Sequence, residues 1–205
     1  MWAGGRVRAS GTLRCGEPAT RRSRVLSAED KQGRSGPLTF VTVHHQVLQG
    51  GSVIVDERQD VVYRAAAGPV GQRAAAPAPG QRVPAGEGER PIDVSPTLLF
   101  RFSALTYNAH RIHYDRGYAR DAEGYPGLVV HGPLQALAMA ETARAAGCQG
   151  SAGAGDLIFD YRLLSPLFDH QGMVVSAVRE PNAIRTAVRD SYGRQTASGT
   201  LRSSR

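Results

Sequence analysis

The chain has 205 residues, of which 41% are apolar and 21% are charged. At about 150 residues per domain, this length lies between one domain and two. The composition is typical of globular proteins and excludes wholesale disorder. No apolar run approaches the roughly 18 residues that a membrane-spanning helix needs, so we expect no membrane partner.

The chain is strongly basic, with a net charge of +7 that comes almost entirely from arginine, since Lys31 is its single lysine. The basic residues are scattered and do not form a stripe with interleaved aromatic residues. We therefore expect them to meet phosphate groups of a small ligand or an acidic carrier protein, and we expect no nucleic-acid partner. Cys15 and Cys148 form neither a CxxC pair nor a cluster with histidine, which predicts free thiols in a reducing compartment and no zinc site.

Residues 1–28 carry six arginines but a single acid, Glu17. This charge pattern is typical of a mitochondrial transit peptide. The alternation of polarity over 5–9 instead favours a strand. We favour the strand, and with it a cytoplasmic location. If 1–28 is a transit peptide, the expected location is mitochondrial.

Two β-rich segments come next, over 38–48 and 53–64, separated by Gly50-Gly51. They predict a long hairpin with a polar interruption at 56–60. Residues 65–96 are dense in Ala, Pro and Gly and are predicted to be a linker.

The C-terminal part begins with alternating apolar residues from Leu98 to Ala104, which predict a strand, followed by a polar loop over 106–127. A helix is expected over 133–146, because Pro133 suits a first turn and Gly147 suits the left-handed position after the last one. Four strands are then predicted, over 157–164, 173–179, 183–190 and 196–202. One helix with about five strands predicts an α+β fold in which an antiparallel sheet wraps around a long helix.

Chemistry-bearing side chains are concentrated between 105 and 132, where the loop NAHRIHYD over 108–115 is followed by GLVVHG over 127–132. Imidazole is suited to proton transfer at neutral pH. A helix N-terminus offers unpaired N–H groups where an oxyanion could form. The two segments together predict a proton-transfer site beside an oxyanion hole.

These two segments resemble the MaoC-like hydratases and dehydratases of the hot-dog fold, whose loop reads Asp-x-Asn-Pro-Ile-His-x-Asp. TYNAHRIHYD and EGYPGLVVHGPL are closer still to the branch that contains the hydroxyacyl-thioester dehydratases of type 2 and the mesaconyl- and itaconyl-CoA hydratases. The resemblance implies a double hot dog with an incomplete N-terminal half. It divides the chain into a partial hot-dog domain over 1–64, the linker over 65–96 and a catalytic hot-dog domain over 97–205.

The resemblance also implies roles for individual residues. His113 falls at the position of the catalytic base and Gly132 at that of the backbone N–H that binds the thioester oxygen. Asn108 occupies the position of the family's catalytic Asp, and because an amide cannot exchange a proton as a carboxylate does, it can only orient water or a hydroxyl. The expected substrate-binding residues are His110, His131, Arg111 and Tyr114.

Structural interpretations stand beside these roles. His110 and His113 could be loop histidines that only form hydrogen bonds, and His131 could simply be packed at the helix start. Asp115 is expected to stabilise a helix start over 114–120. We assign His44 and His45 to a strand, without a catalytic role.

The function that this resemblance implies is that of a hydro-lyase, which adds water to a 2-enoyl thioester or dehydrates a 3-hydroxyacyl thioester of CoA or acyl carrier protein. No metal and no cofactor are expected. A hot-dog thioesterase and a non-catalytic acyl-thioester binding module remain as alternatives. Because the first hot-dog helix is missing, we expect a homodimer or a partner that covers the N-terminal half.

Overall fold

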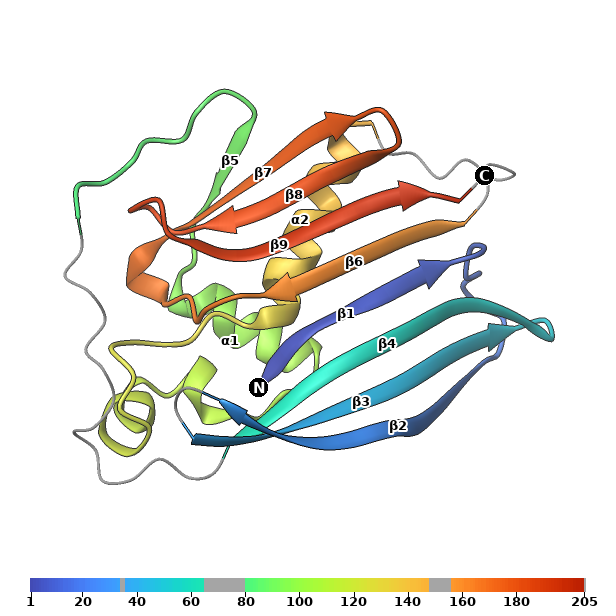
Figure 1. Ribbon diagram of the computed structural model, residues 1–205, viewed down its shortest axis with the longest axis horizontal. Coiled ribbons are helices and arrows are strands. Elements are labelled where there is room, and N and C mark those ends of the chain that lie inside the picture. Colours follow the sequence, from blue (N-terminus) through green and yellow to red (C-terminus); the bar gives the residue numbers. More distant parts are fainter. Residues whose placement is uncertain (34–35, 65–79, 148–155, 205) are drawn as a thin grey trace.

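The computed structural model describes residues 1–33, 36–64, 80–147 and 156–204. Within them, nine antiparallel strands form one sheet in the order β2-β3-β4-β1-β6-β9-β8-β7-β5. Figure 1 shows the long helix α2 lying along one face of this sheet. No helix in the described part of the chain is long and apolar enough to cross a membrane.

The N-terminal half of the sheet has four strands, of which β2, β3 and β4 form a meander while β1 pairs with β4. Its strands are β1 (Trp2–Ala9), β2 (Ala19–Gly33), β3 (Gly36–Gln49) and β4 (Ser52–Arg64). Gly50 and Gly51 join β3 to β4, and both have a positive φ, as a tight hairpin turn requires. The predicted hairpin is confirmed. The predicted interruption over 56–60 is wrong, because the polar side chains there alternate between the two faces of a continuous β4.

Strand β1 joins the two halves of the sheet, since it pairs with β4 on one side and with β6 (Leu157–Leu163) on the other. The strand predicted over 5–9 is therefore confirmed. Neighbouring backbone comes very close to β1: a Cβ added at Gly4 would lie 2.6 Å from the carbonyl oxygen of Tyr161, and one at Gly5 would lie 2.5 Å from that of Arg58. Glycine is therefore required where β1 is inserted between its neighbours.

The C-terminal half wraps around α2 (Gly132–Ala145), as predicted. Beside β6, its other predicted strands are β7 (Met173–Glu180), β8 (Ala183–Arg189) and β9 (Gln195–Ser203). The small side chains of Ala136, Ala138 and Ala143 are buried against the sheet, so the helix approaches it closely. Gly147 follows the helix with φ +94°, the left-handed conformation that its position predicted.

Two predictions for the segment before the site are wrong. The alternating residues from Leu98 form α1 (Pro96–Leu105), not a strand. Ser95 caps this helix by accepting a hydrogen bond from the Leu98 N–H, and its buried residues, Leu99 and Ser103, are spaced i, i+4. The predicted linker contains the short strand β5 (Glu89–Ile92), which pairs with β7 at the edge of the sheet, while 65–79 lies outside the described residues.

Three short helical turns complete the fold, namely η1 (Arg111–His113), η2 (Tyr118–Ala122) and η3 (Asp169–Gln171). The first two lie in the stretch that the sequence predicts to be a polar loop. All three flank the start of α2. They bring the chemistry-bearing loop and the entry to the long helix together.

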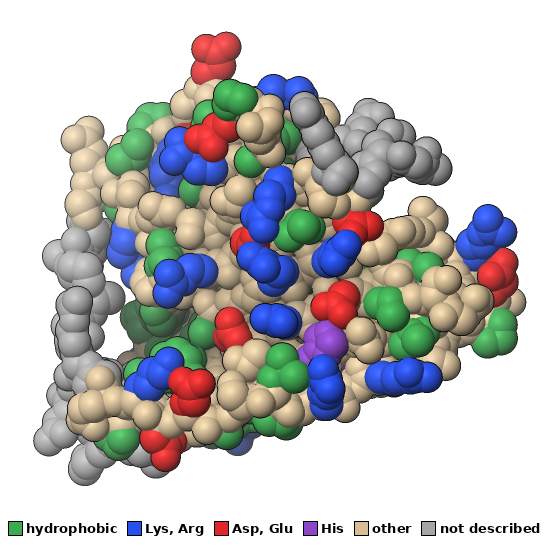
Figure 2. Space-filling model, turned by 45° about the vertical axis from the view of Figure 1, so that its right-hand side comes forward, with side chains coloured by type: hydrophobic (Ala, Val, Ile, Leu, Met, Phe, Trp, Pro, Cys, Tyr) green, Lys and Arg blue, Asp and Glu red, His purple; other side chains and the backbone are tan. Residues whose placement is uncertain are grey.

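The two faces of the sheet differ in character. On the inner face, α2 and the strands bury an apolar core that includes Met139, Phe159 and Val175. On the outer face, charged side chains pair across strands, as Arg6 of β1 and Arg202 of β9 both do with Asp160 of β6, at 2.5 and 2.6 Å. Figure 2 shows arginines and acidic side chains interspersed across the molecular surface. The α+β hot-dog arrangement predicted from the sequence is confirmed.

Candidate active site

The centre of the site is a pair of stacked histidine rings. His113 ends η1, and His131 is the residue that caps the N-terminus of α2. Their ring centroids are 3.7 Å apart and their planes differ by 19°. Both side chains are buried, with 8% of His113 and 0% of His131 exposed. Residues 18 positions apart in the sequence therefore form one compact unit.

One hydrogen bond fixes the tautomer of His113. Its Nδ1 lies 2.7 Å from the carbonyl oxygen of Val129, which can only accept, so Nδ1 carries the proton. Nε2 is left with its lone pair free to take a proton. Burial lowers the pKa of His113 to about 4, and the nearby His110 adds to the effect, while the bond to Val129 acts in the opposite direction. His113 is therefore neutral at neutral pH.

His131 is held on three sides. Its Nε2 lies 2.8 Å from Ser103 Oγ of α1, and the ring of Phe102 meets it edge-on at 4.9 Å. Its Nδ1 is buried without a hydrogen-bond partner among the described residues. Burial, followed by the charges of His113 and His110, lowers its pKa to about 3. A side chain enclosed in this way fits the packed interpretation, and its contact with substrate stays a prediction.

Asn108 and His110 lie on the loop between α1 and η1. The backbone N–H of Asn108 donates to the carbonyl of Ser103 at 2.9 Å, and its side-chain Oδ1 accepts the N–H of His110 at 3.0 Å. The amide is thus held at the end of α1, and its Nδ2 has no hydrogen-bond partner within the described part of the chain. The His110 ring is exposed and stands edge-on to His113, at a centroid distance of 5.6 Å. The structure therefore brings Asn108, His110 and His113 to one place.

Arg111, Tyr114 and Asp115 are mainly engaged with the loop itself. Arg111 pairs with Asp115 at 2.8 Å, and its guanidinium lies 4.1 Å from the centre of the Tyr118 ring. Tyr114 donates its hydroxyl hydrogen to the carbonyl of Ala109 at 2.9 Å. Asp115 Oδ1 accepts the N–H of Tyr118 at 2.9 Å and so stabilises the start of η2, which confirms its predicted structural role.

Gly132 is the first residue of α2, so its N–H has no acceptor within the helix and lies where the helix dipole is positive. Its surroundings leave no room for a side chain. An added Cβ would lie 2.2 Å from Leu163 Cδ1 and 3.4 Å from Trp2 Cβ. Glycine therefore allows Leu163 of β6 to pack directly against the start of α2.

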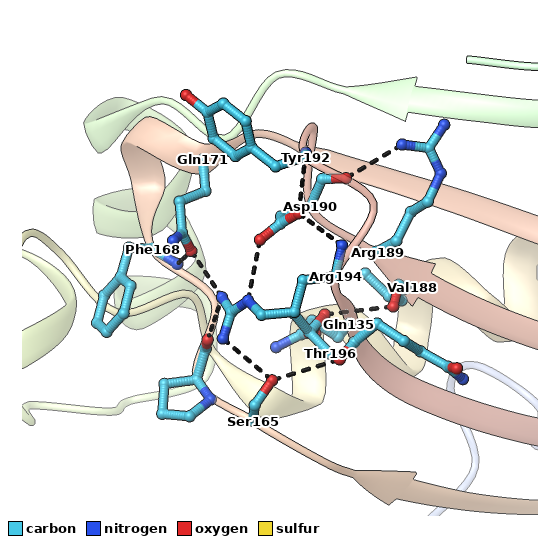
Figure 3. A network of polar contacts seen from close by, with 12 residues as sticks. Gln135, Ser165, Phe168, Gln171, Val188, Arg189, Asp190, Tyr192, Arg194 and Thr196 are labelled. Atoms are coloured by element: carbon cyan, nitrogen blue, oxygen red, sulfur yellow. Dashed lines mark hydrogen bonds and ion pairs between the residues drawn. The ribbon is translucent and has the colours of Figure 1, made fainter. Parts of the chain in front are cut away.

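The segment that carries Val129 is supported by a polar network behind it (Figure 3). Arg194 donates to the carbonyl of Pro166 at 3.0 Å, to Gln171 Oε1 at 2.9 Å and to the buried Asp190 at 3.0 Å. This fixes the chain over 166–171, where Leu167 accepts the N–H of Val130 at 2.8 Å and Phe168 forms a β-bridge with Val129. All these contacts are satisfied within the fold, so the network is a support for the site.

An apolar cavity of about 640 Å³ begins at the same end of α2 and runs beside the helix. Its walls are mostly apolar, with Glu57, Glu141 and Arg144 as charged members, and they come from β1, β4, β6, β9 and α2. They include Trp2, Pro133, Ala136, Ala140, Phe159 and Leu201. The cavity comes nearest to the site at Pro133, the residue after Gly132, and neither His113 nor His131 lines it.

Two contributors were missed by sequence reasoning. Ser103 lies in the segment predicted to be a strand, where nothing marks one serine as different from another. The carbonyl of Val129 carries no side-chain signal at all. The Ser95-Pro96 pair, which is typical of a helix start, could have identified α1 and thus the helical face of Ser103. Among the described residues, no group of three or more His, Cys, Asp or Glu side chains converges as a metal site would require.

The antiparallel sheet wrapped around α2 defines a protein of the hot-dog fold. The family of hydroxyacyl-thioester dehydratases type 2 matches residues 1–169, and the chain belongs to it. It is 48% identical over 170 residues to mesaconyl-C(4)-CoA hydratase of Chloroflexus aurantiacus, a match that covers 82% of this chain and 58% of that protein.

Solved structures share the fold at lower identity. HtdX of Mycobacterium tuberculosis matches 100% of this chain and 76% of its own, with 16% identity and a TM-score of 0.74. A second protein of the same organism, described as having a double hot-dog fold, matches 99% of this chain and 74% of its own, with 16% identity and a TM-score of 0.58. These likenesses support the fold alone, and the chain spans little more than half of the curated relative.

Proposed function

We propose that the chain acts as a hydro-lyase on acyl thioesters, adding water to a 2-enoyl thioester or removing it from a 3-hydroxyacyl thioester. The observation that carries this proposal is the bond between His113 Nδ1 and the Val129 carbonyl, since it leaves Nε2 as a neutral base. The free N–H at the start of α2 lies at the other end of the same short segment. Family membership favours the same reaction.

In hydration, His113 Nε2 takes a proton from water, and the water oxygen bonds to the β-carbon. The electron pair of the double bond moves to form an enolate, whose oxygen the Gly132 N–H stabilises. The imidazolium then returns its proton to the α-carbon, so one water is consumed and no other reagent is needed. A pKa near 4 makes this imidazolium a better proton donor in the second step and makes the neutral ring a weaker base in the first.

Asn108 takes a different part from that of a carboxylate. Its Oδ1 is engaged by the His110 N–H, which leaves the Nδ2 hydrogens to donate to the attacking water or to the product hydroxyl. His113 then carries both proton steps. His110, Arg111 and Tyr114 are proposed to contact the substrate at the rim of the site.

The cavity beside α2 suits the acyl chain, since its walls are mainly apolar. The arginine excess suits the phosphates of CoA or of a carrier-protein prosthetic group. The thioester sulfur lies between these two regions in this arrangement. The substrate class is therefore an acyl thioester with an apolar acyl part.

We further propose that a second copy of the chain covers the inner face of β1–β4. α2 covers the strands of the C-terminal half, whereas no described helix lies over Val25 of β2, which is 63% exposed, or over its cross-strand partner Val43. The same face carries polar residues such as Glu57 and Gln59, and exposed valines bordered by polar side chains are typical of an interface. Twofold dimers are the commonest way of covering such a face.

One assay on the chain separates the proposed reaction from its alternatives. A 2-enoyl thioester is supplied, and both the enoyl absorbance and the free thiol are followed. A hydro-lyase removes the absorbance without releasing thiol. Thiol release would identify a thioesterase, and tight binding with neither change would identify a non-catalytic binding module.

A further inference from the structure

Ser103 is a buried residue of α1 that is hydrogen-bonded to both Asn108 and His131. It is 5% exposed. Its carbonyl accepts the N–H of Asn108 at 2.9 Å, which fixes where the loop leaves the helix. Its hydroxyl lies 2.8 Å from Nε2 of His131. A single serine thus anchors the residue that is proposed to orient water and the ring on which the base rests.

The contact between Ser103 and His131 also affects His113, because the rings of His131 and His113 are stacked. The His131 ring lies between Phe102, edge-on at 4.9 Å, and His113, stacked at 3.7 Å. The Ser103 hydroxyl is the single hydrogen-bond partner of this ring within the described residues, because Nδ1 has none. An imidazole ring rotates about its Cβ–Cγ bond, and the hydrogen bond at Nε2, far from that bond, opposes the rotation in addition to the stacking.

We propose that Ser103 is a positioning residue that sets the orientation of the His113 ring by holding His131. The inference rests on the proposed function, in which His113 is the base. It adds a residue from a third element, α1, to a site otherwise formed by η1 and the start of α2.

Removing the hydroxyl would leave both nitrogens of His131 buried without partners, an arrangement that proteins avoid. The ring would tilt, or water would enter beside it. Either change exposes the face of His113 that the stack protects. Because burial is the main cause that lowers the pKa of His113, that pKa should then rise from about 4 toward its ordinary value of 6.5. The titratable groups that act on the pair are His110 and the two rings themselves.

The test compares Ser103→Ala with Ser103→Thr, which keeps the hydroxyl. Thr142→Ala is the matched control, because it removes a buried hydroxyl of α2 that bonds only within its own helix, to the carbonyl of Ala138 at 2.8 Å. The titration of His113 is followed by NMR of the histidine rings, and kcat and KM for enoyl-thioester hydration are measured against pH. We expect Ser103→Ala to raise the pKa of His113 by one unit or more and to lower kcat about tenfold or more at unchanged KM. Ser103→Thr and Thr142→Ala should titrate like the wild type.

A second comparison, made in a protein that carries His131→Phe, keeps the test decisive if Ser103→Ala alone folds poorly. His131→Phe keeps an aromatic ring under His113 but removes both nitrogens, so Ser103→Ala should have no further effect on the titration of His113 in that background. An unchanged titration in Ser103→Ala alone, or a further shift in the His131→Phe background, would overturn the proposal. If the proposed function is wrong, the wild type will hydrate no enoyl thioester. The NMR titration does not depend on that activity, so it still decides whether Ser103 positions His113.

Discussion

The ring of His113 lies face to face with that of His131, with centroids 3.7 Å apart, and both rings are buried. Two stacked imidazoles that are both buried cannot both be protonated without strong repulsion. Burial is the main cause that keeps the proposed base neutral, and the nearby His110 adds to it. Burial also makes the stability of the fold depend on pH.

The pKa of His113 is about 4 in the fold and 6.5 as the ordinary value, so the unfolded chain binds the additional proton between these two values. Stability is then fully present above pH 6.5 and is lost as the pH falls toward 4. The His113→Gln variant lacks this titration. Urea unfolding at pH 7 and pH 5 should show a loss of stability that is smaller in His113→Gln than in the wild type by about 1 to 2 kcal/mol. Equal losses in the two proteins would show that His113 titrates normally in the fold.

Close packing at Gly132 predicts a coupling with Leu163. Gly132→Ala places a Cβ 2.2 Å from Leu163 Cδ1, and the strain should cost about 1 to 3 kcal/mol. Leu163→Val removes that methyl group from β6 while keeping a residue suited to a strand. The double variant should lose less stability than the sum of the losses in the two single variants. A double-mutant cycle of urea unfolding measures this difference. Simple additivity would mean that the two side chains do not compete for this space.

Tyr107 adopts a left-handed backbone with φ +52° and is 97% exposed. It lies at the end of α1, where its N–H donates to Ala104 and the next N–H donates to Ser103, the pattern in which glycine is preferred. Tyr107→Gly should therefore be more stable than Tyr107→Ala by about 1 kcal/mol. Both variants remove the ring, so their difference in thermal melting isolates the backbone. A more stable alanine variant would contradict the left-handed turn.

The proposed second copy predicts that charge on the inner face prevents association. Val25→Asp places a carboxylate on the uncovered inner face of β2, and Val178→Asp makes the same change on the outer face at a similar exposure of 56%. Sedimentation equilibrium should show a dimer for the wild type and for Val178→Asp, and a smaller species for Val25→Asp. A wild-type protein that is a monomer and melts cooperatively would rule out the proposal that a second copy covers this face.

The helices and strands that bury one apolar face could be predicted from the spacing of their apolar residues. The long helix and the strands around it bury apolar residues at regular spacing, and glycine marks their ends. β2 was missed because it is an edge strand with arginines on both sides, among them Arg21 and Arg22, and carries little apolar periodicity. β5 was missed because it is four residues long and contains Pro91, which only an edge strand tolerates.

The site was predictable in its residues but not in its contacts. His113, Asn108 and Gly132 are marked by their motifs. The stack of His113 on His131 and the bond to Val129 depend on how η1 meets the start of α2, which no local pattern encodes. Segment 98–104 shows the cause most clearly, since its alternating apolar residues indicated a strand while the cap at Ser95 and burial at Leu99 and Ser103 formed a helix.

The most direct test of the central claim is the hydration rate of a 2-enoyl thioester by His113→Ala beside that of the wild type. His44→Ala is the control, because that histidine pairs with Asp56 on the outer face of the sheet. With circular dichroism and melting showing folded proteins, the rate should fall by about 10² to 10⁴-fold in His113→Ala and stay near the wild-type value in His44→Ala. An unchanged rate in folded His113→Ala would contradict the assignment of this residue as the base.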